Sequence, residues 1–145
     1  MSHDYDFTSK IYDPLLYPAL RGIRGAVTRA LASHKHSKIL DLCCGTGNQL
    51  KILSRAGFTD LHCLDISPGM LKVAGRGRPD YRIYEADARS TGFDDGMFDV
   101  VILSFAIHEK EPDTQRAMIG EAHRVLKKDG LLLVVDYLFD KKSFA

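Results

Sequence analysis

The sequence lacks the features that would point to a membrane protein or a nucleic-acid-binding protein. Lysine plus arginine (20) and aspartate plus glutamate (19) nearly cancel to a formal net charge of +1, without the basic excess of most nucleic-acid-binding proteins. No apolar run approaches the ~20 residues of a membrane-spanning helix, and the first residues lack the basic-then-apolar order of a signal peptide. We therefore expect no nucleic-acid partner and no stable membrane insertion.

Cysteine is also scarce. The three cysteines are Cys43, Cys44 and Cys63. An odd number, with two of them adjacent, is a poor disulfide framework and lacks the paired spacing of a zinc site. We expect reduced thiols, no bound metal and a cytoplasmic protein.

What is present is the composition of one ordinary globular domain. The 145 residues are 45% hydrophobic and 27% charged, which is typical of folded proteins. The chain has no internal repeat, low-complexity tract or linker rich in proline and serine. We predict one domain over residues 1–145, with an N-terminal helical cap over 1–36 and a core over 37–145.

Segments with helix-like and strand-like apolar spacing alternate along the chain. Strands are predicted over residues 38–43, 60–65, 81–85, 98–105 and 131–137. Helices are predicted over 17–33, over 47–56, from Pro68 (capped by Ser67) to Gly75, and from Pro112 to Leu126. In the first helix, Leu20, Val27, Ala30 and Leu31 share the apolar face, and Arg24 lies largely elsewhere. Strands separated by helices predict an α/β fold with a doubly wound, mostly parallel sheet and helices on both faces.

A glycine-containing turn follows the first strand, at the edge where such sheets bind ligands. It reads Asp41-Leu42-Cys43-Cys44-Gly45-Thr46-Gly47, and its glycines allow the backbone to approach a ligand closely. A phosphate-binding loop would need Gly-Lys-Ser/Thr, which is absent, and a dinucleotide site would favour a third glycine where Leu50 stands. S-adenosylmethionine needs only the tight turn. The turn can also be purely structural.

Acidic residues end the next two predicted strands. The carboxylate of Asp65 can accept hydrogen bonds from both hydroxyls of a ribose, or it can cap a helix or face solvent. Asp87 can accept from an adenine amino group, or it can be a surface residue in the turn before Arg89. Together with Asp41, these residues would contact different parts of one nucleoside.

These motifs resemble the class I S-adenosylmethionine-dependent methyltransferases, in particular the small-molecule branch that includes the ubiquinone/menaquinone-biosynthesis methyltransferases. The family's first motif, D-x-G-x-G-x-G, is similar to residues 41–47, with Cys43 in place of the first glycine. We interpret that departure as a less strained first position. Four further segments resemble the family: residues 11–16, which would fold over the cofactor, 64–71, 98–102 and 124–130, where Lys128 and Asp129 depart from the pattern.

The resemblance implies S-adenosylmethionine as the cofactor, with Asp65 binding its ribose and Asp87 its adenine. The implied cofactor-binding residues are Tyr12, Asp41, Cys43, Gly45, Thr46, Gly47, Asp65, Ile66, Met70, Asp87, Ala88 and Ser104. Met70 would pack beneath the adenine or belong to the core. Tyr5, Tyr12 and Tyr17 would form an aromatic lid or the apolar face of an N-terminal helix.

The candidate catalytic residue is His108, just past the fourth strand. Methyl transfer from a sulfonium is a direct displacement, so a base is needed only when the acceptor must lose a proton. His108 can supply that base, or it can line the acceptor pocket or cap a loop. The other histidines are expected at the surface or on helix faces: His3, His34, His36, His62 and His123.

One departure from the family concerns the sheet edge. The family's sheet normally continues past the fifth strand with a helix and two more strands, whereas only residues 138–145 follow here. We therefore expect a sheet without its usual last two strands and a partly open acceptor pocket. We also expect a homodimer in which a second copy covers the apolar edge at Leu131–Tyr137.

The leading hypothesis is a methyltransferase that uses S-adenosylmethionine to methylate a small molecule by direct displacement. The first alternative is a non-catalytic or incomplete S-adenosylmethionine-binding domain without a full acceptor site. The second is a nicotinamide-dependent oxidoreductase, which the missing third glycine disfavours. The identity of the acceptor does not follow from the sequence.

Overall fold

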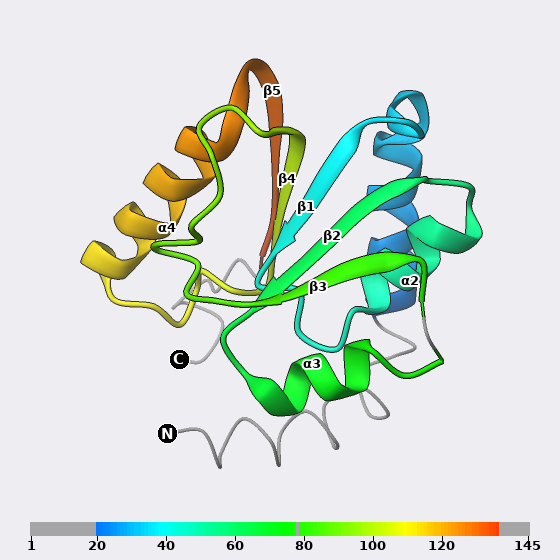
Figure 1. Ribbon diagram of the computed structural model, residues 1–145, viewed down its shortest axis with the longest axis horizontal. Helices are drawn as coiled ribbons and strands as arrows, with labels where there is room; N and C mark the ends of the chain where they lie inside the picture. The colour runs from blue at the N-terminus through cyan, green and yellow to red at the C-terminus, as the bar shows by residue number, and fades with distance from the viewer. Residues whose placement is uncertain (1–19, 78, 137–145) are drawn as a thin grey trace, which may run out of the picture.

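The computed structural model describes residues 20–77 and 79–136, and these form a five-stranded sheet flanked by helices (Figure 1). The sheet order is β3-β2-β1-β4-β5, and every pairing within it is parallel. The strands are β1 (Lys38–Leu42), β2 (Asp60–Asp65), β3 (Tyr81–Glu85), β4 (Phe98–Ser104) and β5 (Leu126–Val135). The predicted doubly wound α/β fold is confirmed.

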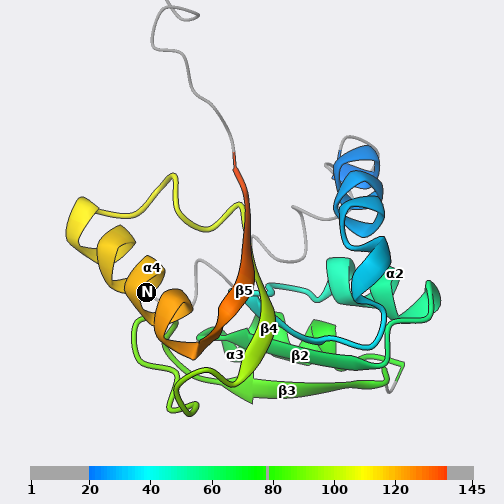
Figure 2. The ribbon, with the colours of Figure 1, turned by 90° about the horizontal axis from the view of Figure 1, so that it is seen from above.

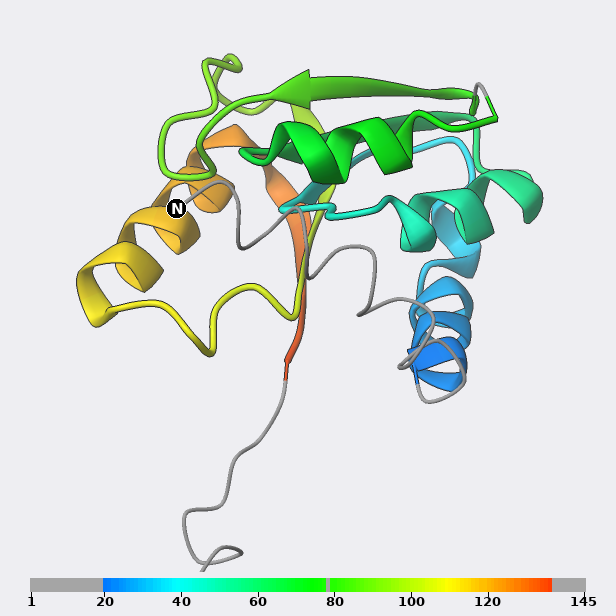
Figure 3. The ribbon, with the colours of Figure 1, turned by 90° about the horizontal axis from the view of Figure 1, so that it is seen from below.

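Helices cover both faces of the sheet (Figures 1 and 3). They are the helix over residues 20–30, the short η1 (Ala32–His34), α2 (Asn48–Arg55), α3 (Pro68–Ala74) and α4 (Pro112–Val125). The helix over 20–30, α2 and α3 pack in one layer with residues such as Ile39 and Cys63. On the opposite face, α4 packs against Leu40 and Val101. None of the helices in the described ranges has both the length and the apolar character to cross a membrane.

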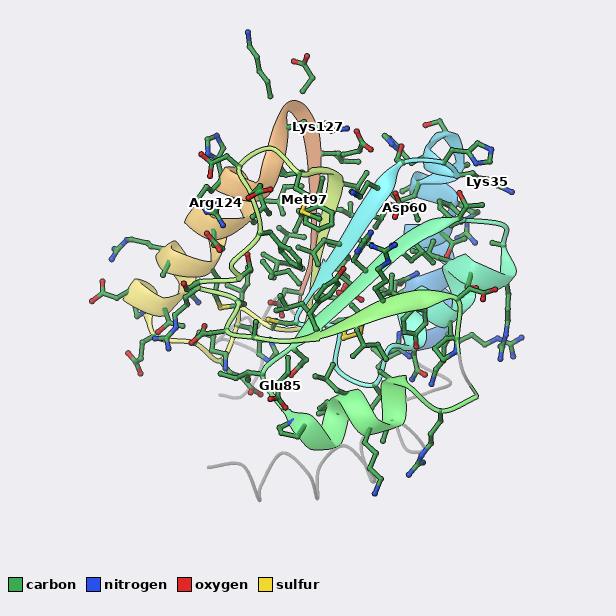
Figure 4. All side chains as sticks on the ribbon, in the orientation of Figure 1. Lys35, Asp60, Glu85, Met97, Arg124 and Lys127 are labelled. Carbon is green, nitrogen blue, oxygen red and sulfur yellow. A yellow bond between two sulfur atoms is a disulfide. The ribbon has the colours of Figure 1, made fainter. Side chains whose placement is uncertain are left out.

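The chain reverses direction across the sheet at β1. It steps outward from β1 to β2 and β3, then crosses to β4 and continues to β5. The carboxyl ends of all five strands therefore lie at one edge, and the crevice at such a reversal is where open α/β sheets bind ligands. In Figure 4, Glu85 lies at this edge, while Lys35 and Asp60 lie at the opposite one.

Local signals place the starts of α3 and α4 as predicted. The hydroxyl of Ser67 accepts a hydrogen bond from the Met70 N–H at 3.3 Å, and Pro68 opens α3. Pro112 likewise opens α4. Side-chain caps and proline at the first turn act over a few residues, so they are readable without tertiary information.

The helix over residues 20–30 corrects one prediction. Leu20, Val27 and Leu31 are buried as expected, but Ala30 is exposed and Arg24 has a buried Nη1 atom. Positions 20, 24, 27 and 31 repeat at intervals of four and three, so they form one stripe on the helix. Arg24 therefore belongs to the inner face, where its carbonyl oxygen accepts from Gln49 of α2 and its charge acts on Asp41 of β1.

His62 is also placed differently from the prediction. It is 1% exposed, with its Nε2 atom 2.7 Å from Asp60 Oδ1 and its Nδ1 atom 3.0 Å from the Tyr84 hydroxyl. Its ring also packs edge-on against Phe98. Burial lowers the pKa of His62. The partners on β2 and β3 satisfy both ring nitrogens, which is why this polar side chain tolerates the interior.

The fifth strand begins earlier than predicted, at Leu126 rather than Leu131. Leu126 pairs with Phe98, and the register shifts before Val100 pairs with Leu131. Lys127 in the irregular stretch donates to Asp99 at 2.9 Å. A Cβ on Gly130 would lie 2.9 Å from the Lys127 carbonyl oxygen, so the tight approach requires glycine there.

The sheet is strongly twisted, as Figure 2 shows for β3 and β5. Both are edge strands. On β5, Leu131 is 38% and Val134 is 47% exposed. Within the described residues, the sheet edge formed by β5 is therefore partly apolar and exposed.

Candidate functional site

The turn between β1 and α2 is folded back over the end of β2. The N–H groups of Cys43 and Cys44 both donate to the Leu64 carbonyl at 2.9 Å. Three residues of the turn have a positive φ: Cys43 (77°), Gly45 (55°) and Gly47 (78°). The turn therefore alternates left-handed with ordinary backbone over five residues.

Cys43 does not relieve strain at the first motif position, which corrects the prediction. Its φ of 77° lies in the left-handed region, which costs a side-chain-bearing residue about 1–2 kcal/mol. Burial, reinforced by the charges of Asp65 and Asp41, raises the pKa of the Cys43 thiol to about 12. This thiol is thus a poor nucleophile near neutral pH.

The two glycines of the turn are required for different reasons. A Cβ on Gly47 would lie 2.6 Å from the Tyr81 hydroxyl oxygen and 3.0 Å from the Ala74 Cβ, so packing against α3 and β3 excludes a side chain. Among the described residues, a Cβ on Gly45 would meet only the Met70 sulfur, at 4.0 Å. The space that the described residues leave beside Gly45 fits a turn that a ligand approaches, whereas Gly47 serves the scaffold.

A disulfide joins Cys44 in the turn to Cys63 on β2. This finding overturns the expectation of reduced thiols and leaves Cys43 as the free cysteine. The parallel register pairs Asp41 with Cys63, and the turn then brings Cys44 back over the same face of the sheet. Their Cα atoms are 5.5 Å apart, within the range that a disulfide spans.

Asp65 connects the turn to the start of α3. Its Oδ2 atom accepts from the Gly45 N–H at 2.8 Å, and its Oδ1 atom accepts from the Ser67 N–H at 3.0 Å. Ser67, rather than Asp65, caps α3. Each carboxylate oxygen has a second lone pair, so the half-buried Asp65 can still accept from a ligand.

Asp41 is an acidic residue in the interior of the sheet. It is 2% exposed, and its Oδ1 atom has no hydrogen-bond partner among the described residues. Burial raises the pKa of Asp41 to about 7, and the charge of Asp65 acts in the same direction, whereas that of Arg24 opposes it. An unpartnered buried oxygen costs roughly 1–3 kcal/mol, so this position favours a ligand that brings a hydrogen-bond donor.

Asp87 lies in a turn after β3 and contacts Arg89. The Arg89 Nη2 atom is 2.7 Å from Asp87 Oδ2, and Nε is 3.0 Å from Oδ1. The hydrogen bonds from Arg89 lower the pKa of Asp87. These contacts fit the interpretation of Asp87 as a surface residue in the turn before Arg89. That Asp87 accepts from the adenine amino group stays a prediction.

The remaining predicted residues lie around the same edge, in different environments. Ile66 is 64% exposed, whereas Thr46 and Ala88 are buried. Met70 is half-buried beside Gly45, and Ser104 ends β4. Tyr5, Tyr12 and Tyr17 lie outside the described residues. Among residues 20–77 and 79–136, no group of three or more metal-ligating side chains is positioned to hold a metal ion.

His108 lies in the loop between β4 and α4, with its side chain 15% exposed. Its Nδ1 atom is 2.6 Å from Asp136 Oδ1, and its Nε2 atom is 3.3 Å from Glu109 Oε1. Asp136 was not among the predicted site residues. It directly follows β5, so the rule that functional groups follow strand ends would have found it.

Comparison with known proteins identifies the family. A family described as a methyltransferase domain matches residues 39–130, more than half of the chain. The chain belongs to this methyltransferase family. S-adenosylmethionine is the cofactor that the family uses. The described residues fit it, because the unpartnered Asp41 oxygen and the half-buried Asp65 offer acceptors to its ammonium and hydroxyl groups, beside the open face of Gly45.

Two curated relatives show how much of a methyltransferase the chain spans. It is 38% identical over 106 residues to an uncharacterised methyltransferase of Synechocystis sp., covering 73% of this chain and 50% of that protein. It is 35% identical over 134 residues to the demethylmenaquinone methyltransferase of Renibacterium salmoninarum, covering 92% of this chain and 54% of that protein. The chain thus spans about half the length of these relatives.

Solved structures agree on the fold. The PH0226 protein of Pyrococcus horikoshii aligns with a TM-score of 0.73 and 29% identity, over 81% of this chain and 56% of that one. A complex of DhpI with SAM and HEP aligns with a TM-score of 0.79 over 98% of this chain and 66% of that one. At 22% identity, the second likeness shows the fold alone.

Proposed function

We propose that the protein is an S-adenosylmethionine-dependent methyltransferase that methylates a small molecule by direct displacement. The observation that carries the proposal is the pair formed by Asp41 and Asp65 beside the Gly45 turn. The Asp41 Oδ1 atom is buried without a hydrogen-bond partner in the part of the chain that the structure describes, and the Asp65 carboxylate is held by two backbone N–H groups. The bound cofactor supplies an activated methyl group on a sulfonium. The protein's task is then binding, alignment and exclusion of water.

The residues of this edge divide that task. Asp65 binds the ribose hydroxyls, with its orientation already set by Gly45 and Ser67. Asp41 accepts from a donor of the methionine portion, and Asp87 from the adenine. Because Asp65 is fixed before the ligand arrives, little side-chain entropy is lost on binding. The other predicted contacts are Tyr12, Cys43, Thr46, Gly47, Ile66, Met70, Ala88 and Ser104.

His108 is the proposed base for acceptors that must lose a proton. It lies in the loop after β4, and Ile107 and Ala106 of this loop pack in the same apolar cluster as Cys43 of the β1–α2 turn. The candidate base and the proposed cofactor site therefore share one edge of the sheet. The competing interpretation is that His108 lines the acceptor pocket without taking a proton.

The relatives named demethylmenaquinone methyltransferase support a quinone-like ring as the first acceptor to test. The alternative function is an S-adenosylmethionine-binding domain with an incomplete acceptor site.

Calorimetric titration with S-adenosylmethionine and with NADH tests the proposal. We expect saturable binding of the first and none of the second. Binding followed by methyl transfer to a demethylated quinol supports the enzyme, and binding without transfer supports the incomplete domain. Uptake of NADH alone would contradict both.

Cytoplasmic location and homodimerisation remain proposals. The disulfide bears on the first, because structural disulfides persist mainly in oxidising compartments. Alkylating intact cells before lysis would trap any free thiols: modification of Cys44 and Cys63 supports a reducing cytoplasm, and their protection contradicts it.

A further inference from the structure

The end of β5 is joined to the loop that carries His108. Ser104 pairs with Val135, and the Phe105 N–H donates to the Val135 carbonyl at 2.7 Å. Phe105 has a φ of 55°, so the chain turns sharply as it leaves β4. Asp136 directly follows Val135 in the chain, so this pairing brings it against the loop that carries His108.

The two oxygens of Asp136 have different partners. Oδ2 accepts from the Ile107 and His108 N–H groups, at 3.0 and 3.1 Å. Oδ1 lies 2.6 Å from His108 Nδ1, and both side chains are largely buried, at 17% and 15% exposed. One oxygen thus holds the loop backbone while the other faces the imidazole ring.

We infer that Asp136 is a positioning residue that sets the orientation and the tautomer of His108. An ionised carboxylate can only accept a hydrogen bond, so its position 2.6 Å from Nδ1 favours the tautomer with the proton on that nitrogen. In the neutral ring the lone pair then lies on Nε2, the nitrogen that a base needs. This inference rests on the proposed function only for the use of that lone pair; the tautomer is a property of the free protein.

Glu109 also faces the ring and competes for it. Its Oε1 atom is 3.3 Å from Nε2, but its side chain is 74% exposed. Exposed pairs of this kind contribute little because solvent screens them. Lys110 is the next charged residue of the loop, and its positive charge acts to lower the pKa values of Cys43 and Asp87. The buried Asp136 therefore dominates the choice of tautomer.

Asp136→Asn in the full chain tests the inference. The two backbone N–H groups of Ile107 and His108 require an oxygen, so the asparagine carbonyl takes that place and its NH₂ group faces Nδ1. That donor makes Nδ1 the acceptor and moves the ring proton to Nε2. With ¹⁵N-labelled histidine, NMR at a pH where the ring is neutral distinguishes the two tautomers by their nitrogen shifts.

We expect an Nδ1–H tautomer in the wild type and an Nε2–H tautomer in the variant. Glu109→Gln makes the same carboxylate-to-amide change at the opposite ring nitrogen and should keep the wild-type tautomer. A wild-type ring protonated on Nε2 would overturn the inference without any variant. An unchanged tautomer in a folded Asp136→Asn protein would overturn it as well.

Activity separates this inference from the proposed function. If His108 is the base, the reversed ring should lower kcat by 10²-fold or more, the range of general-base effects, with calorimetric affinity for S-adenosylmethionine within about twofold. A reversed tautomer with unchanged kcat would support the positioning role and contradict the base. In a chain without turnover, the tautomer measurement still decides the inference.

Discussion

Two neighbouring strands place Asp41 and Asp65 at the same edge of the sheet, in different surroundings. Asp65 is half-buried and accepts two backbone hydrogen bonds. Asp41 is buried, and this burial raises its pKa to about 7. The net charge of the site therefore depends on pH and on the charge of the bound ligand. Both residues can be tested singly.

Asp41→Asn is expected to change how stability depends on pH. The folded-state pKa of Asp41 is raised from 3.8 to about 7. Protonation therefore stabilises the fold fully below about pH 4, and this stabilisation, at most about 4 kcal/mol, is lost as the pH rises to about 7. Urea unfolding of the ligand-free protein from pH 4 to 8 should show a smaller loss in the variant. Equal loss in both proteins would contradict the raised pKa.

Asp65→Ala is expected to weaken the binding of S-adenosylmethionine by a few kcal/mol at most, since hydrogen bonds to a charged acceptor contribute about 1.5–3 kcal/mol each. Calorimetry measures the change. Asp80→Ala is the matched control, because the exposed Asp80 directly precedes β3 at the opposite edge of the sheet.

The loss must be traced to the ribose, because Asp65→Ala also removes the bond from Gly45. A cofactor analogue without ribose hydroxyls should bind the wild type and the variant with similar affinity. A variant that binds S-adenosylmethionine as tightly as the wild type would contradict the ribose assignment.

At the scale of elements, the β1–α2 turn is the most constrained connection at the site. It is tied to β2 by the bonds to Leu64, by the Gly45–Asp65 hydrogen bond and by the Cys44–Cys63 disulfide. Strained backbone at Cys43 and at Phe105 lies at the ends of adjacent strands, β1 and β4. Such strain persists only where the surroundings hold it, and it clusters at functional sites.

Reduction of the disulfide is expected to destabilise the protein by about 3 kcal/mol, as estimated for a loop of this length; the cysteines are 19 residues apart in sequence. Urea unfolding with and without dithiothreitol measures this. Cys44→Ala cannot form the disulfide, so its stability should be the same with and without dithiothreitol. Alkylation of the unfolded, unreduced protein should modify one thiol of the three; three modified thiols would contradict the disulfide.

Gly47→Ala is expected to destabilise the fold more than Gly45→Ala. Both residues have a positive φ, which costs alanine about 1–2 kcal/mol. Only at Gly47 does the new Cβ meet the Tyr81 hydroxyl, at 2.6 Å. Thermal unfolding should rank the variants in this order, and Tyr81→Phe should cost less in the Gly47→Ala background than alone. Equal losses at the two glycines would contradict the packing argument.

At the scale of the whole molecule, the edge of β5 is the exposed apolar feature that the proposed dimer covers. Leu131 and Val134 are 38% and 47% exposed on this strand, and proteins seldom leave such an edge bare. We expect sedimentation equilibrium at micromolar concentration to show a dimer, and Val134→Lys to shift it to a monomer. A wild-type monomer at that concentration would contradict the proposal.

Local patterns were enough for most of the architecture. The bounds predicted for β2 and β3 are those observed, and the Ser67 cap with Pro68 marks the start of α3. Apolar periodicity, helix-capping residues and the glycine or proline residues that end an element all act within a few residues. They can therefore be recognised in the sequence alone. The same holds for Asp65, whose place at a strand end follows from the fold class. The start of β5 was missed because its pairing with Phe98 overrides the charged, turn-like residues 127–130.

Other features depended on contacts between distant segments. The Cys44–Cys63 disulfide, the buried His62 and the inward-facing Arg24 follow from which face of the sheet each segment covers. The His108–Asp136 pair exists because β4 and β5 are neighbours in register. Local conformational preferences depend on neighbouring residues and can be read from the sequence. Burial and pairing between residues tens of positions apart are decided only when the chain folds into its tertiary structure.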